Sequence, residues 1–141
     1  MNFRLVVLLS GFGLAMGVAS LLGLIPRGVE GWLWLVVGLA CAVVIAKQVA
    51  TRRFQHGFLV GLIAGMISPL IQVIFFPVYL KNNAYAAESF NQLPAGFSPR
   101  LLVLIMTPLL GIFCGVIVGF LAWLFGKFMG SRQPAGASGQ P

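Results

Sequence analysis

Apolar residues fall into four long runs separated by short polar segments. The first run, residues 5–25, contains no charged residue. At about 1.5 Å per helical residue it reaches roughly 31 Å, which is enough to cross the hydrocarbon core of a bilayer. The other three runs cover residues 31–50, 57–80 and 100–126. The pattern predicts an all-α, polytopic membrane bundle of four transmembrane helices, arranged as two antiparallel hairpins within a single domain, residues 1–130.

The segments between the runs carry turn, kink and cap signals. Pro69 and Pro77 interrupt the third run, where proline removes a backbone donor, and we expect a kink near Pro69. In the loop that follows, residues 83–92 favour a short helix on the membrane surface. Ser98 and Pro99 are typical of a helix start, a hydroxyl cap followed by proline at the first helical position. Residues 131–141 are rich in Gly, Ser, Pro and Gln, and predict a disordered tail.

Small residues recur at steps of three or four in every run, which places each set on one helix face. Close approach through small residues is how helices gain van der Waals contact in lipid. We expect the stripes of the third and fourth runs to meet in a tightly packed hairpin. A homodimer contact, or a narrow path for a small solute, are the alternatives. The glycines concerned are Gly13, Gly17, Gly57, Gly61, Gly65, Gly111, Gly115 and Gly119.

Composition supports the membrane assignment. Hydrophobic residues make up 60% of the 141-residue chain and charged residues only 8%, against about 25% charged in soluble domains. The net charge of +7 comes from basic residues scattered between the apolar runs, so it does not indicate nucleic-acid binding. We expect the lipid bilayer to be the main partner.

The distribution of basic residues predicts orientation. With a cytoplasmic N-terminus, six Lys and Arg residues lie inside and three outside, together with both glutamates. This bias favours cytoplasmic termini in a bacterial inner membrane. The interface aromatics Trp32, Trp34, Tyr79 and Trp123 agree, because each lies near a predicted helix end. A competing reading of the first run is a cleavable signal peptide, although the run exceeds the usual signal core.

Groups that carry chemistry are scarce. The chain has no Asp, one histidine and two widely spaced cysteines, Cys41 and Cys114. We therefore expect no catalytic site, metal or cofactor. No ionisable residue lies deep in a run, which argues against proton relays and coupled transport.

Gln72 is the one strongly polar side chain within an apolar run. We expect it to make an interhelical hydrogen bond. Its alternative role is to bind a substrate, in a small polar cluster of Ser68, Gln72 and Thr107 near the Pro69 kink.

The connector after the second run is basic. Lys47, Arg52 and Arg53 can attract anionic lipid headgroups, although membrane orientation explains the same residues. His56 follows them and is expected to be an interfacial residue without a special role.

Several segments resemble uncharacterised bacterial four-pass membrane proteins. They are residues 53–58 entering the third run, residues 75–82 leaving it, and the closing glycine-rich helix. The resemblance is loose, covers residues 50–130 and implies no activity. We expect a non-enzymatic structural or partner-binding membrane protein, its partner being a second copy or another membrane protein. The alternative is an oligomeric transporter or channel component for a small solute or lipid.

Overall fold

The computed structural model describes residues 2–129, and these contain helices but no strand. Four helices are long and apolar enough to cross a membrane: α1 (Phe3–Leu21), α2 (Glu30–Gln48), α3 (Arg53–Ile74) and α6 (Pro99–Met129). Two short helices, α4 (Phe76–Asn82) and α5 (Ala84–Asn91), connect α3 to α6. The predicted four-span helical bundle is confirmed, as is the short helix in the last loop. The tail predicted over residues 131–141 lies outside the described residues.

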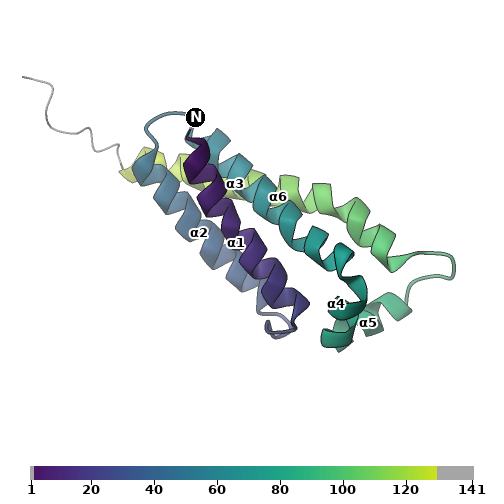
Figure 1. Cartoon of the computed structure of the whole chain (residues 1–141). Coiled ribbons are helices and arrows are strands. Elements are labelled where there is room, and N and C mark those ends of the chain that lie inside the picture. Colours follow the sequence, from purple (N-terminus) through teal and green to yellow (C-terminus); the bar gives the residue numbers. More distant parts are fainter. Residues whose placement is uncertain (1, 130–141) are drawn as a thin grey trace, which may run out of the picture.

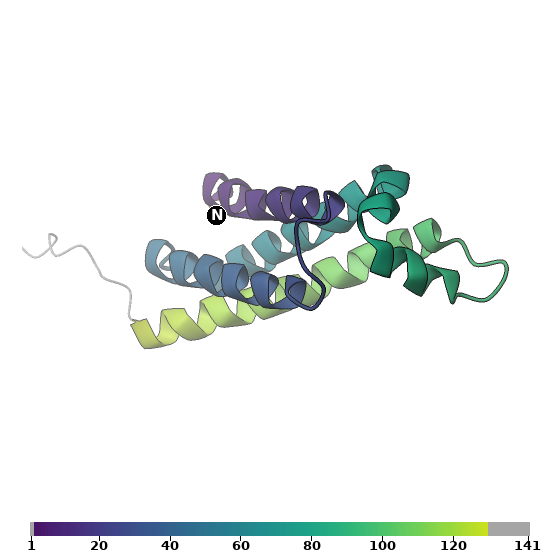
Figure 2. The same ribbon diagram turned by 90° about the horizontal axis from the view of Figure 1, so that it is seen from below.

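The bundle has two ends of different character. α1 begins and α6 finishes at one end, here called the terminal end, and α4 and α5 form the other end (Figure 1). α3 packs most extensively against α6, then against α1, whereas α2 packs mainly against α6. Figure 2 accordingly shows α1 along one edge of the bundle and α6 along the other. The two helices of the first hairpin therefore each rest on a different helix of the second hairpin.

The α3–α6 contact is made by backbone against backbone. A Cβ atom added to Gly61 would lie 2.5 Å from the Cys114 carbonyl oxygen, and one added to Gly57 would lie 2.7 Å from Gly119 Cα. Gly65 faces Gly111 in the same antiparallel register, at 3.0 Å from its Cα. The two stripes thus meet over three successive helical turns.

A second face of α3 receives α1. A Cβ on Gly13 would lie 2.5 Å from Ala64 Cα, and one on Gly17 would lie 3.0 Å from Ser68 Cα. Small residues face the interior while large ones face outward: Ala64 is fully buried, but Leu8 is 75% and Phe113 64% exposed. A soluble protein reverses this distribution, so the exposed side chains match a lipid environment.

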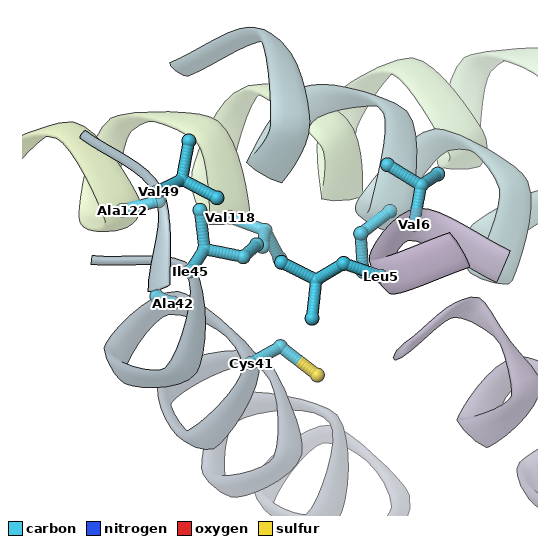
Figure 3. Packing of buried hydrophobic residues seen from close by; sticks show 9 residues of the cluster. Leu5, Val6, Cys41, Ala42, Ile45, Val49, Val118 and Ala122 are labelled. Carbon is cyan, nitrogen blue, oxygen red and sulfur yellow. The ribbon is translucent and has the colours of Figure 1, made fainter. Parts of the chain in front are cut away.

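Larger apolar side chains gather at the terminal end. There Leu5 of α1 points toward Ile45 of α2, with Val118 of α6 close by (Figure 3), and Val6 and Cys41 belong to the same cluster. This cluster closes the terminal end of the bundle. It also keeps α1 near α2, although the two helices share little other contact.

Two helix ends differ from the prediction. The first run was expected to continue to residue 25, but α1 ends at Leu21 because Gly23 adopts φ +68°. The Leu24 N–H then donates to the Ala19 carbonyl, as in a Schellman motif. The prediction placed the helix end too late because the residues on either side of Gly23 are also apolar.

The third run was expected to form one helix over residues 57–80. Instead the helix starts at Arg53, ends at Ile74 and restarts as α4 at Phe76. Pro77 accounts for the break, because it lacks a backbone N–H and its ring crowds the preceding turn. The predicted cap of the last helix is present, with the Leu101 N–H donating to Ser98 Oγ at 3.4 Å.

We predict that Gly61→Ala destabilises the protein by about 1–3 kcal/mol, because the new methyl group meets the α6 backbone, which cannot yield without separating the helices. Gly38→Ala is the matched control, since its Cβ would lie 3.5 Å from Val118 Cγ2, an ordinary contact. Unfolding in mixed detergent micelles measures both variants. Equal stability of the two proteins would contradict the backbone contact described here.

Candidate functional site: a cavity between α2, α3 and α6

A cavity of about 540 Å³ lies between α2, α3 and α6, with one side formed by Phe12 of α1. It runs from Gly38 and Gly61, near the middle of the bundle, to Glu30 and Gln72 at the α4–α5 end. The cavity exists because α2 leans on α6 and makes little contact with α3. Glycines along its walls leave this space unfilled. The volume falls in the range typical of small-molecule sites.

The cavity wall is mainly apolar and aromatic. Phe12 and Trp34 pack edge to face with ring centroids 5.2 Å apart, and thereby join α1 to α2. Trp34 was expected at the membrane interface, but it faces the interior, whereas Trp32 is 70% exposed. Trp32 and Trp34 are two positions apart in α2, so their side chains leave the helix about 200° apart around its axis and cannot share a face. The remaining large side chains of the wall are Leu35, Leu110, Phe113, Ile117, Val118 and Leu121.

Gln72 and Ser68 place polar atoms at the α4–α5 end of the cavity. The Gln72 amide nitrogen donates to Ser20 Oγ of α1 at 3.1 Å, which confirms the predicted interhelical hydrogen bond. This bond leaves the carbonyl oxygen and the second amide hydrogen of Gln72 without a partner inside the protein. The same side chain thus holds α1 to α3 and lines the cavity.

Thr107 is engaged within its own helix. Its hydroxyl donates to the Val103 carbonyl at 2.8 Å, and the side chain is buried. The hydrogen-bond partner of Gln72 is Ser20 of α1. The cluster of Ser68, Gln72 and Thr107 stays a prediction, and Ser20 is the residue that the structure adds to it.

Glu30 begins α2 and lies on the cavity wall. Arg27, the nearest basic residue along the chain, stacks over the Tyr85 ring of α5 at 3.7 Å. Glu30 lies close enough to Tyr79 of α4 to affect its ionisation. Burial, and then the negative charge of Glu30, raise the pKa of the Tyr79 phenol above its ordinary value. The hydroxyl therefore stays protonated at neutral pH.

The three residues proposed for lipid contact separate into two kinds. Lys47 and Arg52 are exposed, and anionic-lipid contact stays a prediction for them. Arg53 instead donates from Nε to the Val49 carbonyl at 2.7 Å and from Nη1 to the Gly126 carbonyl at 3.2 Å. These carbonyls lie near the C-terminal ends of α2 and α6, where a positive charge is favourable. Arg53 thus joins three helices and is not free to bind lipid through these atoms.

His56 is a buried structural link and not the interfacial residue that was expected. Its Nε2 accepts the Asn2 backbone N–H at 2.9 Å, and its Nδ1 lies 2.9 Å from the Arg52 carbonyl. A backbone N–H can only donate and a carbonyl can only accept. The arrangement therefore requires the neutral ring with its hydrogen on Nδ1.

Two asparagines secure the other end of α1, and sequence reasoning missed them. The Asn82 amide donates to the Leu21 carbonyl at 3.1 Å, and the Asn83 amide to the Ser20 carbonyl at 2.9 Å. Both carbonyls belong to the last turn of α1, where the regular i+4 donors are missing, and the Ser20 carbonyl also accepts the Gly23 N–H of the helix cap. The adjacent Asn-Asn pair beside a helix end was the available signal, but its target could not be known without the fold.

The described residues hold no group of three or more His, Cys, Asp or Glu side chains that could bind a metal ion. Within the same residues, Cys41 and Cys114 are free thiols. The cavity therefore offers binding contacts, with Glu30 as its ionisable group apart from the Cys114 thiol.

No protein-family model, curated protein or solved structure matches the chain. The resemblance to bacterial four-pass proteins therefore stays a prediction.

The Gln72–Ser20 hydrogen bond should appear as a coupling energy. We predict that Gln72→Met and Ser20→Ala destabilise non-additively, with a coupling of roughly 0.5–1.5 kcal/mol, because either variant alone removes the same bond. Unfolding of the two single variants and the double variant in mixed micelles measures the coupling. Strictly additive effects would show that the bond does not contribute to stability in the membrane.

Proposed function

We propose that this protein is a non-enzymatic membrane protein that binds a small amphipathic molecule or a lipid, with the apolar part of the ligand in the cavity. The supporting observation is the wall of the cavity: aromatic and aliphatic side chains along its length, and the polar residues Glu30, Ser68 and Gln72 gathered at one end. This separation of apolar and polar surface matches an amphipathic ligand, and sites of this composition commonly bind small molecules.

Transport of such a ligand, by an oligomer, is compatible with this binding role. A permanent aqueous pore is not favoured, since the terminal end is closed by the cluster around Ile45 and Val118. A catalytic role has no support from the residues of the cavity, which include neither a histidine nor a nucleophile next to a base.

Association with another membrane helix is less well supported than ligand binding. The outward face of α6 carries large side chains such as Leu109, Ile112 and Phe120. Its small residues, Gly111, Gly115 and Gly119, are already engaged with α3. Because close helix contact in lipid depends on small residues, this face is better suited to lipid chains.

We further propose that the protein lies in a bacterial cytoplasmic membrane with the terminal end on the cytoplasmic side. The bias of Lys and Arg toward that end supports this orientation. The end of the cavity near Glu30 would then lie at the outer side of the membrane.

The orientation can be tested with engineered cysteines. In intact cells that express the protein, we expect a membrane-impermeant maleimide to label Ala95→Cys, in the loop before α6, and not Thr51→Cys, in the α2–α3 connector. Both positions are exposed, so reactivity reports the side of the membrane. Permeabilised cells provide the control, in which both cysteines react. If only Thr51→Cys is labelled in intact cells, the protein has the opposite orientation in the membrane.

Ligand binding can be tested by blocking the cavity. Gly31 lies on the cavity wall and has no atom within 4 Å of an added Cβ, so Gly31→Leu should fold normally while its side chain occupies the cavity. A variant with Trp34 as its single tryptophan reports occupancy, because a bromoalkyl alcohol bound nearby quenches it. We expect saturable quenching, and a loss of affinity of roughly tenfold or more in Gly31→Leu.

The matched control is Gly11→Leu. Gly11 is exposed and has open space around it, as Gly31 does, but it does not belong to the cavity wall. Its substitution should leave the quenching curve unchanged. A probe that is only dissolved in the surrounding bilayer gives quenching that rises linearly with the alcohol concentration. Such linear quenching, unchanged in Gly31→Leu, would disprove the proposed function.

A further inference from the structure

The polar residues at the α4–α5 end of the cavity include one acid. Glu30 supplies a carboxylate, which only accepts hydrogen bonds when it is ionised. Gln72 has a carbonyl oxygen that accepts and a second amide hydrogen that its bond to Ser20 does not use, and the Ser68 hydroxyl can both accept and donate. The carboxylate is thus the charged group at this end, and it favours a ligand with donors and a positive charge over an anionic one.

The charge of Glu30 is not matched by the neighbouring basic residue. Arg27 precedes Glu30 by three positions, but its guanidinium lies over the Tyr85 ring. Tyr79 is the near neighbour that feels the Glu30 charge, and its hydroxyl is itself neutral. The chain has nine basic and only two acidic residues. One of these two acids, Glu30, lies on the wall of this cavity.

The aromatic side chains of the wall favour the same kind of ligand. Phe12 and Trp34 adjoin the part of the cavity near Glu30, and Phe113 lines it from α6. The faces of aromatic rings attract cations, and the attraction grows when water is excluded. A carboxylate close to such rings is a recurring way to hold an ammonium group.

We propose that the cavity selects amphipathic cations, binding an ammonium group at Glu30 and the Gln72 carbonyl and an alkyl or aromatic body along Phe12, Trp34 and Phe113. This inference rests on the proposed function and adds the class of ligand. Anionic amphiphiles such as fatty acids should bind weakly, because Glu30 repels their headgroup.

The test compares three probes of equal chain length in phosphatidylcholine vesicles: a bromoalkyl ammonium, a bromoalkyl alcohol and a bromoalkyl carboxylate. The readout is saturable quenching of the protein with Trp34 as its single tryptophan. We expect the ammonium to bind about tenfold or more tightly than the alcohol, since a charge-assisted hydrogen bond replaces a neutral one. The carboxylate should bind more weakly than the alcohol.

Glu30→Gln should abolish the preference of the protein for the ammonium over the alcohol, because it removes the negative charge from the cavity wall. Glu88→Gln is the matched control, because Glu88 is the other acid of the chain and is exposed on α5. Saturable alcohol binding without an ammonium preference, or a preference that survives Glu30→Gln, would overturn this inference and leave the proposed function standing. If no probe binds saturably, the proposed function itself fails.

Discussion

The close approach of helix backbones through small residues is the interaction on which the rest of the structure depends. In lipid there is no hydrophobic driving force between helices, so van der Waals contact between closely packed backbones has to supply the attraction. α3 offers this contact on two faces, with Gly57, Gly61 and Gly65 toward α6 and with Ala64 and Ser68 toward α1. The central position of α3 follows from having two such faces. α2 has only Gly38 and Ala42 at comparable positions, and it is the helix that leaves space beside it.

Much of the fold could be predicted because it depends on local patterns. Apolar runs identify the four spans, and the register of glycines in the third and fourth spans indicates which helices pair. The helix ends were less predictable, since Gly23 and Pro77 act through backbone geometry that hydrophobicity does not register. The prediction for Arg53 was wrong for a related reason: a basic residue near the interface attracts either lipid phosphates or helix-end carbonyls, and only the fold places the carbonyls within reach.

The cavity depends on information that a single sequence does not hold. Its existence requires that α2 lean on α6 and stand away from α3, and this is a relation between three helices. Gln72 was identifiable as the one strongly polar side chain of an apolar run, but its partner was not, because Thr107 and Ser20 are equally plausible by depth alone. Glu30 drew attention in the sequence only as a loop charge that bears on orientation. Its position on the cavity wall makes it a candidate ligand-binding residue.

The order of the helices along the chain constrains how the bundle assembles during synthesis. α1 and α3 can pair as soon as α3 has been inserted, since their contact needs neither α2 nor α6. α6 leaves the ribosome after the other five described helices, yet it provides the largest surface for α3 and the main support for α2. Until it arrives, the second small-residue face of α3 is solvated by lipid or by the insertion machinery, and α2 lacks its main neighbour.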